Sequence, residues 1–333
     1  MKQRMANQKQ MENNLQQYLQ HIEASVQAIQ FPENPKTLYE PMSYILRLGG
    51  KRMRPVLTLM ACDAFGADFK TATNAALAVE LFHNFSLIHD DIMDKAPLRR
   101  GEQTVHMKWN ENVAILSGDA MLIEAYKLLS TYNAEKSHAL IKTFNITSTE
   151  VCEGQQLDMD FERSTAVSIP EYLDMIRLKT AVLLGCSLQM GSILANASAE
   201  NQTDIYNFGV NLGIAFQLQD DILDLYADQA KFGKQVGGDI LSNKKTYLIL
   251  KAFEDASADQ RKHLDALLLQ KENPEKIEQA KVLFAALDIK EKATVKMEEF
   301  YTIAMQSLAH LQIAESQKKS FRELAAFLMG REN

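Results

Sequence analysis

The stretch TAVLLGCSLQMGSILANASA, residues 180–199, contains no charged side chain and is bounded by Lys179 and Glu200. It is long enough to cross a bilayer as a helix. Its serine, glutamine, asparagine and glycine residues, however, make it too weakly apolar to insert unaided. A second charge-free stretch, residues 205–219, follows closely. Helices that are apolar on most faces are buried inside a protein, so both stretches predict central helices.

The rest of the chain is poor in helix-breaking residues. It has 14 glycines and 7 prolines in 333 residues, about half of the roughly 12% that these residues make up in average proteins. Long segments with apolar residues at three-and-four spacing predict long helices. An N-terminal helix over about residues 10–30 should end before the prolines that start at Pro32. Residues 251–333, rich in Lys and Glu, predict peripheral amphipathic helices.

No Gly/Ser-rich linker or internal repeat divides the chain. We therefore expect a single all-α domain over residues 1–333, with residues 1–14 as a flexible tail. The N-terminal segment lacks an apolar run, so we do not expect a secretory signal. No membrane span is expected.

The charge balance limits the possible partners. The formal net charge of −7 arises from 36 basic and 43 acidic side chains. No global basic field results, so we expect no nucleic acid partner, and any anion must be bound locally. The three cysteines are odd in number, far apart and not in CxxC spacing. This pattern favours reduced thiols in a cytoplasmic protein.

The pattern DDxxD occurs twice. Its aspartates are Asp90, Asp91, Asp94, Asp220, Asp221 and Asp224. With 19 aspartates in the chain, chance predicts about 0.06 such motifs. On a helix each motif places three carboxylates within an arc of about 100°, and their repulsion is relieved when they share a hard cation such as Mg²⁺. A solvated acidic face, the alternative for one such motif, fits poorly beside the apolar runs FSLIHDDIM and IAFQLQDDILDL.

Cationic side chains occur at informative places. Arg99 and Arg100 lie between Pro97 and Gly101, where a loop would let both guanidinium groups reach phosphate oxygens. A second basic cluster, GGKRMR at residues 49–54, also suits an anion. Further lysines are Lys179, Lys234, Lys244 and Lys245. In such a site the aspartates hold the metal, and Arg and Lys neutralise the remaining phosphate charge.

Several of these motifs together resemble a known family. The motifs are GGKRMR, HDDIMDKAPLRRG, the pair Lys179 and Thr180, FQLQDDILD, FGK and NKKT. Their order and spacing, from about residue 45 to 247, are similar to those of the trans-isoprenyl diphosphate synthases, the polyprenyl synthetase family that includes farnesyl and geranylgeranyl diphosphate synthases. The resemblance implies an all-α domain of helices around a central cavity, with the aspartate motifs on facing helices, and a homodimer. It also implies a Mg²⁺-dependent prenyltransferase that condenses isopentenyl diphosphate with an allylic diphosphate to a C15 to C20 all-trans prenyl diphosphate.

The resemblance implies roles for individual residues. The six aspartates would be the Mg²⁺ ligands. The residues implied to hold isopentenyl diphosphate are Lys51, Arg54, His83 and Arg100. Those implied to hold the allylic diphosphate are Arg99, Lys179, Lys234 and Lys244. Thr180 and Gln217 would lie near the reacting carbons. On a helical wheel His83 lies about 20° from Asp90, so it can face the site, although a hydrogen-bonded core histidine is the alternative.

Product length is implied by the residues before the first motif. Phe85, five residues before Asp90, would close the pocket for the growing tail, and Ser86 beside it is small. An ideal helical wheel turns Phe85 away from the aspartates, so this role rests on the resemblance alone. Phe82, one turn earlier, would restrict the pocket further or pack in the core. A bulky residue here favours C15 to C20, and a longer-chain polyprenyl diphosphate is the alternative.

Two other functions stay open from the sequence. His89 and Asp90 form an HD dyad, as in helical metal-dependent phosphohydrolases, but the chain has no second HD dyad. An inactive helical subunit of a prenyl synthase heteromer is the non-catalytic alternative. Loss of an aspartate motif would favour it, and both motifs are intact.

Overall fold

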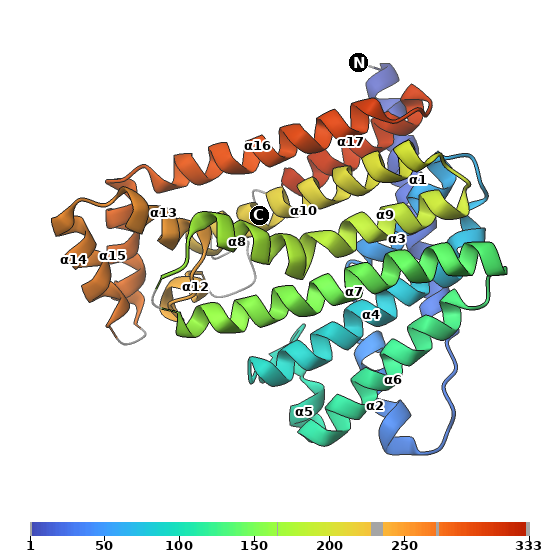
Figure 1. Ribbon diagram of the computed structural model, residues 1–333, viewed down its shortest axis with the longest axis horizontal. Helices are drawn as coiled ribbons and strands as arrows, with labels where there is room; N and C mark the ends of the chain where they lie inside the picture. The colour runs from blue at the N-terminus through green and yellow to red at the C-terminus, as the bar shows by residue number, and fades with distance from the viewer. Residues whose placement is uncertain (1, 165, 228–235, 271–272, 331–333) are drawn as a thin grey trace. The chain divides into compact units, whose positions relative to one another are not determined.

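A computed structural model describes residues 2–164, 166–227, 236–270 and 273–330 and confirms the predicted all-α class (Figure 1). The chain divides into two compact units. Unit 1 comprises Met1–Thr147, Cys186–Tyr206 and Gln312–Gln317. Unit 2 comprises Ser148–Gly185, Asn207–Leu311 and Lys318–Asn333. The single domain with a flexible tail at residues 1–14 stays a prediction.

Unit 1 is built mainly from the first half of the chain. Its elements, some of which it shares with unit 2, are α1 (Lys2–Gln27), α2 (Lys36–Arg47), α3 (Met53–Ala64), η1 (Phe69–Ala72), α4 (Thr73–Met93), α5 (Val105–Lys108), α6 (Glu111–Leu129), α7 (Ala134–Arg163), α9 (Val182–Leu194) and α10 (Ala199–Tyr226). Helix α4 lies alongside α6 and α3 (Figure 1). Every residue from Ala75 to Phe82 is buried, so α4 is the core helix of this unit.

Unit 2 contains the second half of α7, the first residues of α9 and most of α10. Its other elements are α8 (Ile169–Ile176), the π-helical turn η2 (Arg177–Ala181), α12 (Gly238–Leu241), α13 (Tyr247–Asp255), α14 (Ala258–Leu268), α15 (Pro274–Ala285), α16 (Ile289–His310) and α17 (Glu315–Met329). Helix α17 packs on α10, where the rings of Phe208 and Phe321 meet edge to face at 5.7 Å. Gln219 Nε2 also donates to the Met329 carbonyl at 2.7 Å.

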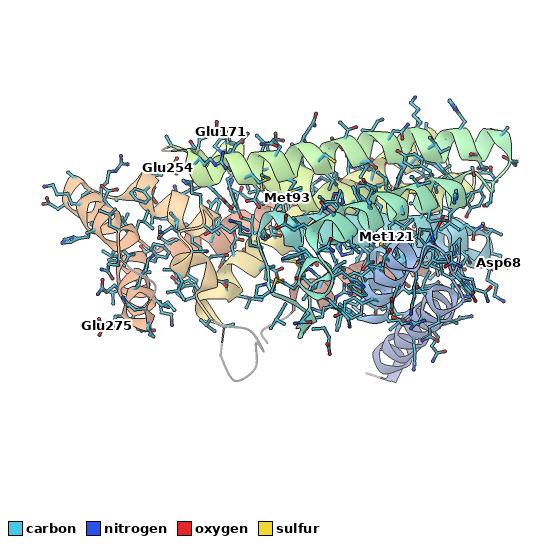
Figure 2. All side chains as sticks on the ribbon, turned by 90° about the horizontal axis from the view of Figure 1, so that it is seen from below. Asp68, Met93, Met121, Glu171, Glu254 and Glu275 are labelled. Carbon is cyan, nitrogen blue, oxygen red and sulfur yellow. The ribbon has the colours of Figure 1, made fainter. Side chains whose placement is uncertain are left out.

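Helix starts follow local signals in the sequence. Ser168 and Glu171 cap each other's backbone at the start of α8, and Pro170 occupies its first turn. Figure 2 labels Glu171. Ser257 and Gln260 form the same reciprocal cap at the start of α14. Such caps satisfy the exposed backbone N–H groups of a first turn, so these boundaries need no tertiary contact to be defined.

The predictions for the apolar stretches are confirmed. Residues from Ala181 to Leu183 and Cys186 to Leu188 are buried in unit 1 or unit 2. No helix among the described residues combines the length and apolar content that crossing a bilayer requires. The N-terminal helix differs in its limits, because α1 runs from Lys2 to Gln27. Helix α17 is amphipathic as predicted: it buries Leu324 and exposes Phe327.

Candidate active site

The basic motif GGKRMR forms the loop that leads into α3. Gly49 and Gly50 have φ angles of 75° and 142°, which side chains rarely allow. Arg52 closes the loop in the left-handed region at φ 47°, and α3 begins at Met53. A Cβ atom on Gly50 would lie 2.8 Å from the guanidinium carbon of Arg100. The bare glycine therefore lets Arg100 reach the loop, where its Nη1 donates to the Gly49 carbonyl.

A short β-hairpin positions Arg100 next to this loop. Strand β1 (Leu98–Arg99) pairs antiparallel with β2 (Glu102–Gln103). Between them Arg100 and Gly101 have φ angles of 55° and 82°. Two successive positive φ angles are typical of the tight turns that join hairpin strands. The predicted loop at the two arginines is confirmed in this form, and Arg99 and Arg100 have different partners.

Arg54, His83 and Arg100 form a cluster around the start of α3. Arg54 Nη1 lies 3.2 Å from His83 Nε2. Burial lowers the pKa of Arg54 to about 10, with a smaller contribution from Arg100. Burial, followed by Arg54 and Arg100, also lowers the pKa of His83 well below its usual range, so its imidazole is neutral. No described residue accepts a hydrogen bond from the buried Nε of Arg54. Neighbouring guanidinium groups repel each other, and an anion that accepts from both would relieve this repulsion.

The first aspartate motif lies at the C-terminal end of α4, and Arg99 is bound to it. Arg99 Nε donates to both carboxylate oxygens of Asp91, at 2.8 and 2.9 Å, and its Nη2 lies 3.9 Å from Asp90 Oδ2. Burial raises the pKa of Asp91, and the Arg99 guanidinium opposes this effect. The predicted phosphate ligand Arg99 is therefore also the counter-ion of the first aspartate motif. Asp94 caps the C-terminus of the helix.

The second aspartate motif lies in the last turns of α10. Asp221 is 3% exposed and accepts hydrogen bonds from the Tyr172 hydroxyl and, at 3.3 Å, the Tyr247 backbone N–H. Burial raises its pKa to about 7, and the Tyr172 hydrogen bond opposes the shift. Gln217 Nε2 lies 3.4 Å from Asp221 Oδ1, so the predicted contact of Gln217 with the reacting carbons competes with this carboxylate. Asp224 Oδ2 accepts from the Asp239 N–H at 3.1 Å.

Both acidic motifs occupy an unfavourable electrostatic position. The C-terminus of a helix carries partial negative charge, which destabilises carboxylates there. Three clustered carboxylates at such an end are a donor set that fits a divalent cation with hard oxygen ligands. Across the described part of the chain, no three Asp, Glu, His or Cys side chains converge into a complete metal cluster. Mg²⁺ usually takes only one or two carboxylates and completes its shell with water and phosphate oxygens, so the motifs fit a metal that arrives with its substrate.

The predicted pair Lys179 and Thr180 lies in the π-helical turn η2 between α8 and α9. Two glycines on neighbouring helices lie against the backbone of this turn. A Cβ on Gly154 of α7 would lie 2.3 Å from the Lys179 nitrogen, and one on Gly213 of α10 would lie 2.8 Å from Ala181 Cα. Two helices therefore approach the backbone of this turn directly. Turns of π geometry are frequent at functional sites.

Asp158 is a site residue that the sequence interpretation missed. Its Oδ2 lies 2.5 Å from Lys179 Nζ and 3.9 Å from Lys244 Nζ. The structure therefore brings together two of the predicted allylic-diphosphate lysines, which lie far apart in the sequence. The only sequence signal for Asp158 is a carboxylate one helical turn after Gly154, and such a pair is too common to be specific. The predicted Lys234 lies outside the described residues.

His89 does not form the metal dyad of a phosphohydrolase. Its Nε2 lies 3.2 Å from the Ile115 carbonyl and 3.7 Å from Asp119 Oδ1, both on α6. The imidazole thus joins α4 to α6 and has its hydrogen-bonding partner there. Lys51 is exposed in the basic loop, next to the cluster around Arg54.

Comparison with known proteins decides the family. The family model described as Polyprenyl synthetase matches residues 35–286. The chain belongs to the polyprenyl synthetase family. A geranylgeranyl diphosphate synthase of Methanosarcina mazei is 41% identical over 70% of this chain and 73% of its own length. One from Saccharolobus solfataricus is 37% identical over 90% of this chain and 91% of its own. A crystal structure of a geranylgeranyl pyrophosphate synthase matches with a TM-score of 0.89 and 46% identity, covering 97% of this chain and 99% of that one.

In this polyprenyl synthetase the predicted chain-length residues form an aromatic row on α4. Phe85 is 9% exposed, and its ring lies 5.6 Å from that of Phe82 and 4.7 Å from that of His89. Phe82 in turn meets the Phe144 ring edge to face at 5.2 Å. Ser86 donates its hydroxyl to the His83 carbonyl at 2.8 Å. Phe85 therefore packs as a core residue, and its role at the end of the tail pocket stays a prediction.

Replacing Phe85 with Ala tests this role directly. If the ring closes the tail pocket, the variant should make longer products, because the space it vacates accepts further apolar carbons. If the ring serves only the core, the free energy of unfolding should fall by roughly 3 to 5 kcal/mol with product length unchanged. Product length by chromatography and the thermal midpoint, measured on the same sample, separate the two results. Phe144→Ala provides the control for aromatic loss in the same row.

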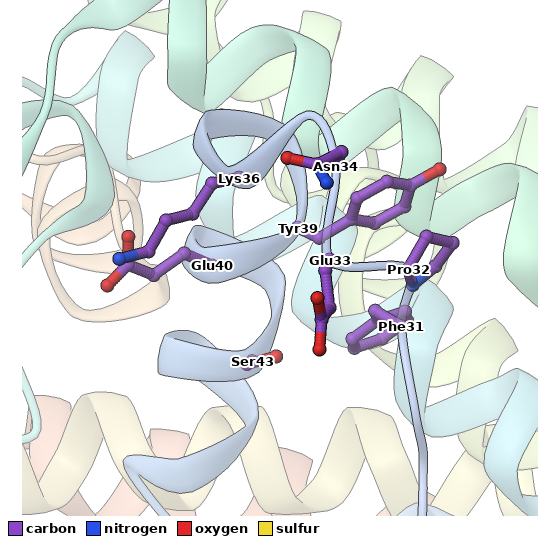
Figure 3. A pocket seen from close by; sticks show the side chains of 8 residues that line it. All are labelled: Phe31, Pro32, Glu33, Asn34, Lys36, Tyr39, Glu40 and Ser43. Carbon is purple, nitrogen blue, oxygen red and sulfur yellow. The ribbon is translucent and has the colours of Figure 1, made fainter.

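Two cavities lie beside the N-terminal helices of the synthetase. One of about 410 Å³ is bordered by the stacked rings of Phe31 and Tyr39 (Figure 3). Another of about 220 Å³ is bordered by Glu23, Gly49 and Arg52. Neither cavity is lined by an aspartate of the two motifs. The second cavity reaches the rear of the basic loop.

Proposed function

We propose that this polyprenyl synthetase condenses isopentenyl diphosphate with an allylic diphosphate in a Mg²⁺-dependent reaction, giving a C15 to C20 all-trans prenyl diphosphate. The observation that carries the proposal is the pair of three-carboxylate motifs at the C-terminal ends of α4 and α10. Clustered carboxylates at such ends are stabilised by a divalent cation, which would bind together with the diphosphate. The intact motifs leave no reason to prefer an inactive subunit.

The isopentenyl diphosphate site is proposed at the Arg54, His83 and Arg100 cluster, with Lys51 at its edge. A diphosphate would relieve the repulsion between the two guanidinium groups and accept from the buried Nε of Arg54. The neutral imidazole of His83 contributes a hydrogen bond without adding charge. This arrangement suits a substrate whose diphosphate is retained through the reaction.

The allylic diphosphate, which departs, is proposed to contact Arg99, Lys179, Lys234 and Lys244. Lys179 and Lys244 share one carboxylate, that of Asp158. Both ammonium groups are donors that suit the oxygens of a leaving diphosphate. Arg99 would exchange part of its contact with Asp91 for phosphate oxygens when that aspartate binds metal.

The chemistry proposed is electrostatic. Bound Mg²⁺ would stabilise the negative charge that develops on the departing diphosphate. The Lys179 ammonium and the Arg99 guanidinium add to that stabilisation. The oxygens of Thr180 and Gln217 are proposed to stabilise the allylic carbocation that the double bond of isopentenyl diphosphate attacks. The motifs supply no strong base, so the released diphosphate is proposed to accept the proton that restores the alkene.

A homodimer is proposed to form over an exposed apolar face of α6. Leu116 and Ile123, seven residues apart and therefore on one face, are 60% and 56% exposed. Helix faces this apolar are commonly covered by a partner. Sedimentation of the pure protein at micromolar concentration checks this: a single species of twice the chain mass is expected, and a monomer would contradict it.

The cytoplasm is the proposed location. Cys62 and Cys186 are buried thiols and Cys152 is an exposed one, a state that persists in reducing compartments.

Incubation of the pure protein with Mg²⁺, labelled isopentenyl diphosphate and each allylic primer in turn tests the function. We expect condensation to products of 15 to 20 carbons and none after chelation of the metal. Products much longer than 20 carbons would replace the proposed chain length, and no condensation with any primer would overturn the function.

A further inference from the structure

Arg52 is buried, although it belongs to the basic loop of the proposed isopentenyl diphosphate site. The residue is 4% exposed, whereas its neighbour Lys51 is exposed. Its Nε donates to Glu23 Oε1 at 3.1 Å, its Nη2 donates to the Leu46 carbonyl at 2.6 Å, and its Nη1 donates to Glu80 Oε1. Each of the three guanidinium nitrogens therefore donates to an acceptor in the protein, and the side chain is buried inside unit 1.

Its main partner, Glu80, is itself held in place on α4. Glu80 is 3% exposed, and Asn84 Nδ2 donates to both its backbone carbonyl, at 2.8 Å, and its Oε1, at 2.9 Å. Burying two opposite charges costs desolvation that is recovered only with good geometry and further hydrogen bonds. Both conditions are met here. Ionic pairs of this kind are poor sources of stability but fix the relative position of the elements that they join.

The pair joins the same two elements that carry the substrate-binding contact. Arg52 and Arg54 lie two residues apart at the start of α3, and Glu80 and His83 lie three apart on α4. Two cross-links thus run side by side from one chain segment to the other, one between Arg52 and Glu80 and the other between Arg54 and His83. Arg52 has a left-handed φ of 47°, and its side chain is buried while that of Lys51 is exposed.

We propose that Arg52, held by Glu80 and Glu23, is a positioning residue that sets the geometry of Lys51, Arg54 and His83 for isopentenyl diphosphate. The inference rests on the proposed site for that substrate. Arg52 itself does not reach the anion, because each of its nitrogens already faces an acceptor in the protein. The pair is expected to act on one substrate, since it joins the same two segments of unit 1 as the contact between Arg54 and His83.

Substitutions that remove the pair in two ways test the proposal. Glu80→Met leaves an uncompensated buried guanidinium and should lower the thermal midpoint. The double variant Arg52→Met with Glu80→Met removes both charges, so its thermal midpoint should recover towards that of the unchanged protein. In the double variant we expect the KM for isopentenyl diphosphate to stay raised by about tenfold or more, with kcat and the KM for the allylic substrate within about twofold. A KM for isopentenyl diphosphate that recovers together with the midpoint would overturn the proposal.

If the double variant does not fold, two milder substitutions test the same proposal. Arg52→Lys keeps the charge but cannot donate to three separated acceptors, and Glu23→Gln weakens one contact at a carboxylate that is 35% exposed. Each should raise the KM for isopentenyl diphosphate about two- to fivefold, and unchanged values in both would overturn the proposal. Tyr18→Phe is the control, because it removes the 2.7 Å hydrogen bond to Asp63 at the other end of α3. It should lower the midpoint and leave both KM values unchanged.

The variant Arg54→Ala distinguishes an error in the positioning role of Arg52 from an error in the proposed substrate site. Arg54→Ala should raise the KM for isopentenyl diphosphate whatever Arg52 does. If Arg54→Ala has this effect and the Arg52 variants do not, only the positioning role is wrong. If Arg54→Ala has no effect, the proposed site is wrong and the inference is overturned with it.

Discussion

Replacing Asp90 or Asp220 with alanine is expected to lower turnover by about a thousandfold. Metal ions typically supply several kcal/mol of charge stabilisation in reactions of this kind, and each tenfold change in rate corresponds to about 1.4 kcal/mol. The free energy of unfolding of the metal-free protein should change little or rise slightly. Each removed carboxylate lies beside other carboxylates of its motif, so its loss relieves repulsion.

Steady-state turnover at saturating Mg²⁺ and thermal unfolding without metal check this prediction together. Glu200→Ala is a suitable control, because it removes an exposed carboxylate at the opposite end of α10. A second check uses the metal itself. With both substrates present, Mg²⁺ should raise the thermal midpoint of the unchanged protein and raise it much less in either aspartate variant. Near-normal turnover in Asp90→Ala or Asp220→Ala would show that the reaction does not need both motifs.

The next largest effects are expected from substitutions that distinguish the two proposed diphosphate sites by their KM values. Arg54→Ala should raise the KM for isopentenyl diphosphate about 10- to 100-fold, because hydrogen bonds between charged groups contribute roughly 1.5 to 3 kcal/mol. The KM for the allylic substrate should change little. Lys179→Ala should show the reverse preference, since Lys179 lies with Lys244 at Asp158.

Initial rates with each substrate varied in turn measure both KM values. Lys262→Ala serves as the control for loss of a lysine, because Lys262 forms an exposed ion pair with Asp259 on α14. Equal effects of Arg54→Ala and Lys179→Ala on both substrates would mean that the cations are divided wrongly between the two diphosphates.

Much of the fold could be predicted because it depends on local signals. The charge-free stretches form buried helices, and Pro170 and Pro274 lie in first helical turns, where the missing N–H costs nothing. The spacing of the aspartates in each motif suits one face of a helix, and the motifs lie on α4 and α10. That these motifs lie on facing helices stays a prediction, since they belong to different units.

The orientation of charged side chains could not be predicted, because it depends on partners that are distant in the sequence. Arg52 and Arg54 look equivalent in GGKRMR, yet Arg52 is turned inward by Glu80, 28 residues later. Arg99 and Arg100 are adjacent, but a hairpin directs one to Asp91 and the other to the Gly49 carbonyl. Neighbours with the same charge thus acquire different roles through tertiary contacts alone.

The two glycines that lie against the turn carrying Lys179, Gly154 and Gly213, limit how this protein can be engineered. Alanine in place of a helical glycine normally gains up to about 1 kcal/mol and is a common route to heat resistance. At Gly154 and Gly213 the added methyl group would meet backbone atoms at 2.3 and 2.8 Å, which cannot yield as a flexible side chain does. The usual stabilising exchange would therefore separate the helices and move the lysine. At these two positions we therefore expect alanine to lower both heat resistance and turnover.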